Sequence, residues 1–112
     1  MLGLSATTRV FLKTGVTDGR LGADALKGLV TQVIREDPHG RQHLFCFCNR
    51  ARNRLRLLWW DGSGFWVAGK GLPRGTYDFP QDAAAVSHLN MAQLEVLVKG
   101  VGFTPASAGY RR

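Results

Sequence analysis

The sequence predicts a single α+β domain, an antiparallel β-meander of about four or five strands with two main helices. Strand-forming apolar residues fill residues 43–49 and 54–60 and return after a glycine-rich turn, and apolar residues recur at helical spacing through residues 21–36. A capping box at Asn90 opens a second helix. A chain of 112 residues is long enough to bury one hydrophobic core without disulfides.

The N-terminal part of the chain predicts a strand followed by a helix. Thr8 to Leu12 is a short β-like run that is closed by Gly15. The helix is expected within residues 21–36, because five apolar residues there form one stripe and Pro38 prevents much continuation. The stripe consists of Leu26, Leu29, Val30, Val33 and Ile34.

The segments that follow predict the meander. His43 to Asn49 is apolar on both faces, which is typical of a strand inside a sheet. Arg54 to Trp60 is the next strand, Asp61 to Gly64 turns the chain, and Phe65 to Gly69 returns it. Gly75 to Phe79 is expected to be a last short strand.

The C-terminal part predicts the second helix. Asn90 and Gln93 are the two polar partners of the capping box, so the helix is expected to run from about residue 91 to 99. Residues 104–112 are expected to be a flexible tail, and the ordered core of the single domain then spans about residues 8–103.

The positive charge is large and unevenly distributed. The formal net charge of +7 at pH 7 favours an anionic partner, and nucleic acid is the first candidate. Between Arg41 and Tyr77 there are seven Arg or Lys residues against one acid, Asp61. Arginines recur at every second position from 50 to 56, so those in an extended segment project from one face. The predicted DNA-binding residues are Arg50, Arg52, Arg54, Arg56, Lys70 and Arg74. The alternative interpretation of the arginines at positions 50 to 56 is that they form only a solvated hairpin edge, which deters aggregation.

Three tryptophans accompany the basic residues. Trp59 and Trp60 are adjacent, so they point to opposite faces of a regular strand, and both cannot enter a one-sided core. Trp66 follows in the returning strand. Each ring either packs in the core or is exposed, where it would stack on a base or fill a protein interface.

Catalytic residues and cofactors are not predicted. The sequence has no nucleophile elbow, no phosphate-binding glycine loop and no dinucleotide motif. Asp18, Asp24 and Asp61 are the carboxylates considered for a two-metal nuclease. Turn and helix-cap roles explain all three without a metal ion.

The cysteines and the hydropathy indicate the compartment. Cys46 and Cys48 are expected to be reduced, buried thiols, and His43 lies on the opposite face of their strand, so no metal site is predicted. No run approaches the roughly 18 apolar residues of a membrane span, and the first residues do not resemble a signal peptide. A cytoplasmic protein without a membrane partner is expected.

Five motifs follow one another along the chain. They are Thr17-Asp18-x-Arg20, Leu21-Gly22-Ala23-Asp24-Ala25-Leu26, Leu44-Phe45-x-Phe47, Leu58-Trp59-Trp60-Asp61-Gly62-x-Gly64-Phe65 and Leu72-x-Arg74-Gly75-x-Tyr77-x-x-Pro80. From about residue 8 to 103 the chain resembles TnpB, the accessory protein encoded by the second open reading frame of the IS sixty-six family of bacterial insertion sequences. That family is unrelated to the RNA-guided nucleases of the same name. The resemblance implies a structural role for six residues of these motifs, which are Thr17, Asp18, Arg20, Asp61, Gly62 and Gly64.

The resemblance implies an accessory, non-catalytic role in transposition beside a separate DDE-type transposase. The family usually has a Lys-Arg-Leu-Glu-Arg-Gly run, whereas this chain has Lys70-Gly71-Leu72-Pro73-Arg74-Gly75 and so lacks one arginine and one glutamate. The expected partners are DNA of the nucleoid, bound with little or no sequence specificity, the transposase and other proteins of the same element, and a second copy in a homo-oligomer.

Two functional hypotheses follow. In the first, the basic hairpin binds DNA and the protein assists the transposase. In the second, the protein is an adaptor that docks the transposase or self-associates through a Trp-rich patch, with little DNA affinity of its own. A buried ion pair between Arg20 and Asp61 is a separate hypothesis, which the sequence alone does not decide.

Overall fold

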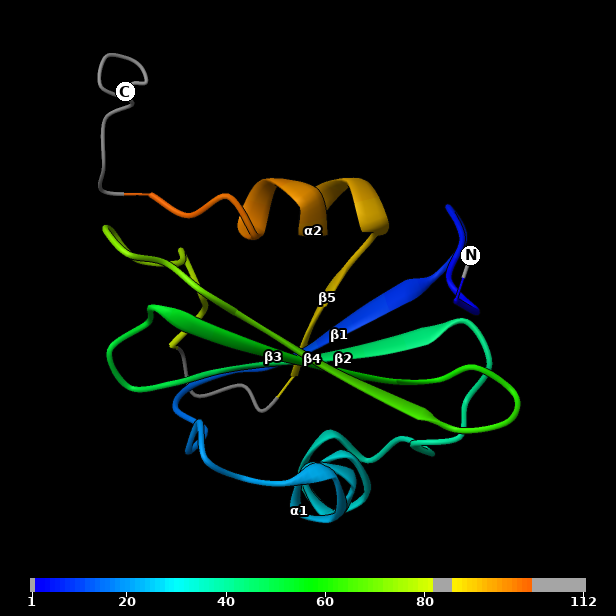
Figure 1. Cartoon of the computed structure of the whole chain (residues 1–112). Helices are drawn as coiled ribbons and strands as arrows, with labels where there is room; N and C mark the ends of the chain where they lie inside the picture. The colour runs from blue at the N-terminus through cyan, green and yellow to red at the C-terminus, as the bar shows by residue number, and fades with distance from the viewer. Residues whose placement is uncertain (1, 82–85, 102–112) are drawn as a thin grey trace.

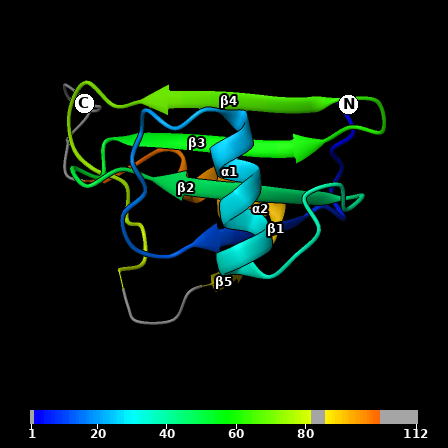
Figure 2. The ribbon, with the colours of Figure 1, turned by 90° about the horizontal axis from the view of Figure 1, so that it is seen from below.

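A computed structural model of the chain describes residues 2–81 and 86–101. It contains a five-stranded sheet with α1 against one face and α2 against the other (Figures 1 and 2). In chain order the elements are β1 (Arg9–Lys13), α1 (Ala23–Leu29), the π-helical segment η1 (Val30–Ile34), β2 (His43–Cys48), β3 (Arg54–Trp60), β4 (Phe65–Gly71), β5 (Val86–Leu89) and α2 (Met91–Leu97). The predicted α+β class is confirmed. The expected tail at 104–112, with the end of the ordered core at 103, lies outside the described residues.

The strands are ordered β4-β3-β2-β1-β5 across the sheet. β2, β3 and β4 form the predicted antiparallel meander, with Trp59 opposite Leu44 on one side and opposite Trp66 on the other. β1 departs from the expected antiparallel arrangement, because it pairs parallel with β2 from Arg9↔His43 onwards. Parallel neighbours need a long crossover, and here α1 and η1 provide it.

The last strand is not where the sequence placed it. β5 pairs antiparallel with β1, starting at Val10↔Leu89, whereas residues 75–79 form no strand and contribute only an isolated bridge between Thr76 and Val101. The backbone N–H of Tyr77 donates to the Arg52 carbonyl oxygen at 2.7 Å, so this segment closes the end of the sheet. Tyr77 and Phe79 of the predicted strand are buried against that end.

The helix predicted within residues 21–36 is divided in two. α1 gives way to η1, and the residue after η1, Arg35, has φ 65° and ends the helical path before Pro38. Leu26, Val30 and Ile34 of the predicted stripe are buried. They pack with the side chains of the sheet face that α1 covers, which are Phe11, Phe45, Phe47 and Leu58.

The second helix begins as the sequence predicts. The Gln93 N–H donates to Asn90 Oδ1 at 2.8 Å, and the Asn90 N–H donates to Gln93 Oε1 at 2.9 Å, which completes the capping box. α2 ends at Leu97, two residues before the expected limit. Its buried residues, Leu94 and Leu97, pack on the second core cluster. From the sheet and the segment at its end, this cluster takes Val10, Leu12, Leu44, Cys46, Cys48, Leu55, Trp59, Tyr77 and Phe79.

Candidate nucleic-acid interface

The turn between β2 and β3 is held by the side chain of Asn49. Its Oδ1 accepts the backbone N–H groups of Asn53 and Arg54, each at 3.0 Å, and its Nδ2 donates to Asn53 Oδ1 at 2.9 Å. Arg52 has φ 58°, a left-handed conformation that these bonds stabilise. The turn therefore presents exposed Arg50 and Arg52 on a fixed backbone.

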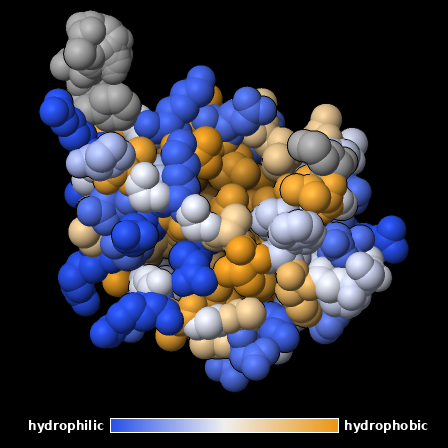
Figure 3. Space-filling view, in the orientation of Figure 1, coloured by the Kyte–Doolittle hydropathy of each residue, from blue (hydrophilic) through white to orange (hydrophobic). Residues whose placement is uncertain are grey.

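The segment after β4 brings a further cation to the same end of the sheet. The Leu72 N–H donates to the Asn53 carbonyl oxygen at 2.9 Å, so the loop that carries Arg74 lies against the β2–β3 turn. Arg54 pairs with Gly71 in the adjoining ladder position. Hydrophilic residues gather at this end, on the left of Figure 3. We call these four exposed residues the basic end: Arg50, Arg52, Arg54 and Arg74.

The other two predicted DNA-binding residues are engaged in internal hydrogen bonds. Arg56 Nη1 donates to the carbonyl oxygens of Gly19 at 2.8 Å and Leu21 at 2.9 Å, and so ties the loop before α1 to β3. Lys70 Nζ donates to the Val98 carbonyl oxygen at the end of α2, at 2.8 Å. Arg56 faces the α1 side of the sheet and Lys70 faces the α2 side, so the six cations do not share one face.

The basic end has no carboxylate partner within the described ranges 2–81 and 86–101. The ion pairs found there are Arg20–Asp18 at 3.1 Å, Lys27–Asp24 at 2.9 Å and, when His39 is protonated, His39–Asp37 at 3.4 Å. Arg20 also lines a shallow polar hollow of about 500 Å³ together with Arg50. Sequence reasoning missed Arg20 as a neighbour of the basic end. The loop that carries Arg20 meets the end of β2 through the backbone hydrogen bond from Thr17 to Cys48, a contact between distant parts of the chain that no local pattern indicates.

Arg20 and Asp61 do not pair with each other. Arg20 is bound to Asp18, two residues away, through both Nε and Nη2 at 3.1 Å. Asp61 closes the β3–β4 turn by accepting from the N–H groups of Ser63 at 2.8 Å and Gly64 at 2.9 Å and from the indole of Trp66 at 2.8 Å. These donors lower the pKa of Asp61 to about 2. Gly62 completes this turn with φ 105°.

The tryptophans lie at the opposite end of β3 from the basic end. Trp59 is buried, donates from Nε1 to the Leu2 carbonyl oxygen at 2.8 Å and stacks on Trp66 with ring centroids 5.9 Å apart. Trp60, on the other face, packs edge-on against Phe65. Arg54 and Trp60 begin and end the strand, about 20 Å apart at the rise of a β-strand. A base stacked on a tryptophan would therefore not be the neighbour of a phosphate at the basic end.

Metal ligation and thiol chemistry have little support in the parts of the chain that are described. There, no group of three or more His, Cys, Asp or Glu residues could hold a metal ion. Cys46 and Cys48 are free and buried, and burial raises the pKa of both thiols, that of Cys48 to about 11. His43 is on the other face, edge-on to Phe11.

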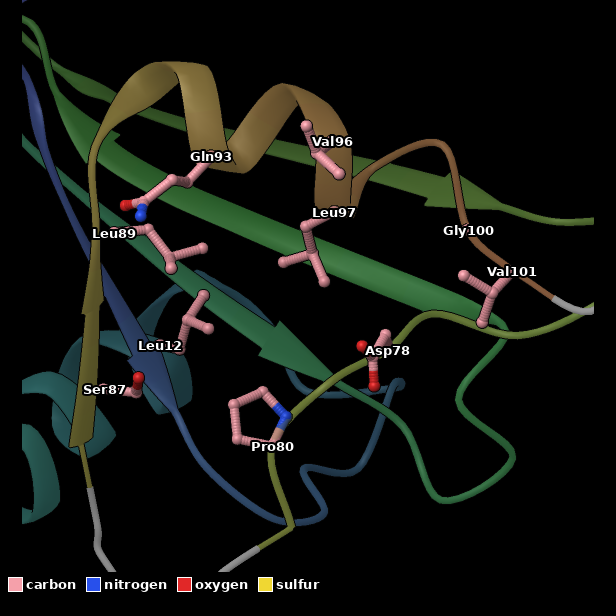
Figure 4. Close-up of a pocket in the computed structure, with 10 residues that line it drawn as sticks. All are labelled: Leu12, Asp78, Pro80, Ser87, Leu89, Gln93, Val96, Leu97, Gly100 and Val101. Atoms are coloured by element: carbon pink, nitrogen blue, oxygen red, sulfur yellow. The ribbon is translucent and has the colours of Figure 1, made fainter.

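An apolar pocket of about 250 Å³ lies between α2, β5 and the segment before residue 81. Leu12, Leu89 and Leu97 line it from three different elements (Figure 4). Its charged lining residue is Asp78, so this pocket does not extend the positive surface.

Comparison with known proteins identifies the family. The model of the family described as "IS66 Orf2 like protein" matches residues 8–108. The chain belongs to this family. Its members are accessory proteins associated with transposition, and the family is not a known catalytic group.

Two relatives from Sinorhizobium fredii (strain NBRC 101917 / NGR234) are similar over most of their length. "Uncharacterized protein y4jC" is 32% identical over 104 residues, which cover 93% of this chain and 88% of the relative. "Uncharacterized protein y4hO" is 33% identical over 101 residues, covering 90% and 87%. No solved structure matches the chain. In the described ranges, no helix has the length and apolar character needed to cross a membrane.

Proposed function

We propose that this IS66 Orf2-like protein binds DNA through its basic end and thereby assists a separate transposase. The observation that carries the proposal is that Arg50, Arg52, Arg54 and Arg74 are exposed at one end of the sheet without a carboxylate partner among the described residues. Guanidinium groups bind phosphate oxygens in bidentate fashion, and release of counterions from DNA makes such contacts favourable.

The arrangement supports contact with the phosphate backbone more than reading of bases. The arginines of the basic end project from a turn, a loop and the first residue of β3, and neither α1 nor α2 carries any of the six predicted cations. Phosphate contacts position a protein on DNA without selecting a sequence. The proposed binding is accordingly of low sequence specificity.

Salt dependence of duplex binding tests the proposal. Each phosphate contact contributes about 0.9 to the slope of log affinity against log salt, so changing Arg52 and Arg54 together to alanine should reduce the slope by about 1.8. The matched control changes Arg9 and Arg41, exposed cations near the starts of β1 and β2, and removes the same charge from the opposite end. The proposal fails if the slope of both double variants equals that of the wild type, or if the slope falls by the same amount in both.

The second candidate function is a protein-interaction adaptor. Trp66 supports it, because 41% of this large apolar residue is exposed. An adaptor would retain the transposase in a pull-down, lose it on Trp66→Ala, and bind duplex DNA no better than the Arg52 and Arg54 double variant does.

A further inference from the structure

β4 is an edge strand of the sheet. The strand order makes it the outermost of the five, and within residues 2–81 and 86–101 it pairs with β3 alone. In Figure 2 no helix or strand lies beyond it. Its seven residues, Phe65–Gly71, contain no proline and no acid, and Lys70 is their single charge. Natural edge strands are usually short, charged, bulged or covered, so a strand of this kind is suited to pairing with another strand.

The outward hydrogen-bonding groups of β4 can be assigned from the two ends of its ladder. The Asp61 N–H donates to the Gly64 carbonyl oxygen at 3.0 Å, and the Leu72 N–H donates to the Asn53 carbonyl oxygen at 2.9 Å. Since hydrogen-bonded pairs alternate in an antiparallel ladder, the even-numbered residues of β4 bond to β3. The N–H and C=O groups that face away from the sheet then belong to Phe65, Val67, Gly69 and Gly71.

The side chains of β4 are complementary to those of an identical strand running the other way. With Ala68 opposite Ala68 of a second copy, Phe65 and Val67 each face a glycine, and the aromatic ring of Trp66 faces a cation. Phe65 faces Gly71, Val67 faces Gly69, and Trp66 faces Lys70. In this register the outward groups of Val67 and Gly69 form a hydrogen-bonded pair, while Trp66 and Lys70 form the closer, non-hydrogen-bonded pair.

We propose that two copies of the chain associate edge to edge through β4, in the antiparallel register centred on Ala68. The pairing satisfies up to about eight outward backbone groups in each copy, through about eight hydrogen bonds in four hydrogen-bonded residue pairs. It covers the exposed face of Trp66 and sets each indole opposite Lys70 of the second copy. One N–H of the Lys70 ammonium group donates to the Val98 carbonyl oxygen of its own copy, and its two other N–H groups remain for a cation–π contact with the indole.

The proposed pair also extends an existing apolar surface. Trp66 and Ala68 share the α2 side of the sheet, where Leu57, Met91 and Val98 are only partly buried. Figure 3 shows apolar residues in the hollow between α2 and the front of the sheet. A second copy carries this surface across the β4 edge, so the joined sheets would have ten strands with a continuous α2-side face.

The two-fold axis of such a pair passes midway between the two Ala68 residues, perpendicular to the sheet, so the two basic ends point in opposite directions. The orientation of the two basic ends affects DNA binding only if the proposed function also holds. The pairing through β4 does not depend on the proposed function, and the test of the pairing uses no DNA.

Sedimentation equilibrium at rising concentration of the full chain tests the pairing, because an edge-to-edge interface is small and expected to be weak. The wild type should form a dimer. Trp66→Lys opposes two ammonium groups across the edge and should weaken the dimer by about tenfold or more. Adding Lys70→Glu to that variant replaces repulsion by two opposite-charge pairs, and should restore the dissociation constant to within about threefold of wild type.

Val96→Lys is the matched control, since it places the same charge on an exposed apolar residue of α2, 70% exposed, and should leave the dimer intact. Thermal unfolding of each variant verifies its fold. A monomeric wild type at all concentrations overturns the proposal, even if a strand of the transposase binds the edge. Failure of Lys70→Glu to rescue, or equal loss in the control, overturns it as well.

A cysteine at the two-fold axis gives a second, independent readout of the register. Cα atoms of a non-hydrogen-bonded pair lie about 4.5 Å apart, within reach of a disulfide. Ala68→Cys should therefore form a covalent dimer under mild oxidation, whereas Val96→Cys should not. Equal cross-linking of both variants, or none of Ala68→Cys, contradicts the centred register.

Discussion

Arg56 Nη1 donates to the carbonyl oxygen of Gly19 at 2.8 Å, joining β3 to a loop that precedes it by 37 positions. The same nitrogen reaches Leu21, so one partly buried guanidinium holds the entry to α1. The loop it holds also carries Arg20 and Asp18 beside the basic end. Arg56 therefore supports the shape of the candidate interface, whatever part it has in contact with DNA.

Arg56→Ala should destabilise the protein by about 2 kcal/mol, because two carbonyl oxygens lose a charged donor. Arg54→Ala, at the exposed neighbouring position on the same face, should change the free energy of unfolding by less than about 0.5 kcal/mol. Urea denaturation of the two variants measures the difference. Equal stabilities would mean that the Arg56 hydrogen bonds contribute nothing to the fold.

Asn90→Ala should reduce stability by about 1 kcal/mol, since the first turn of α2 loses its capping acceptor. Asn90→Asp keeps an acceptor for the Gln93 N–H and should remain near wild type. Urea denaturation compares the two variants directly. A similar loss in both would place the role of Asn90 outside the capping box.

Asp61 should make stability depend on pH in the acidic range. Its pKa in the folded state is about 2, below the ordinary value near 4. The ionised carboxylate therefore contributes stability that is fully present above about pH 4 and is lost as the pH falls through about 2. Thermal melting of wild type and Asp61→Asn across this range measures the effect, and the gap between the two should shrink toward low pH. Parallel melting curves would show that the turn does not depend on the charge.

The two thiols should be unreactive in the folded protein. Burial raises the pKa of Cys46 and Cys48, so the thiolate fraction at pH 8 is small and reagents lack access. A chromogenic disulfide reagent should label neither thiol in the native state and both after denaturation. Rapid labelling of the native chain would indicate local opening of β2.

The sequence predicts well those features that depend on neighbouring residues. Strand-forming apolar runs and the turn residues between them identified β2, β3 and β4, and the spacing of Asn90 and Gln93 identified the start of α2. The parallel pairing of β1 depends on where the crossover helix lies, which no local pattern contains. β5 has four residues and no fully buried side chain, so its alternation carried little signal.

For the cations too, the sequence predicts what depends on local pattern and does not predict what depends on distant contacts. Strand parity places Arg54 and Arg56 on one face, as the structure confirms. Whether a given cation is free depends on partners far away in the chain, such as Val98 for Lys70. Periodicity cannot separate a cation that holds the fold together from one that is available to a ligand.

The central claim is that the basic end contacts DNA, and an amide chemical-shift map of the labelled protein titrated with a short duplex tests it most directly. We expect the largest shifts at residues 49–54 and 72–77, and little change at the Asp61 to Trp66 turn. Shifts concentrated at that turn, or no shifts at low salt, would contradict the account.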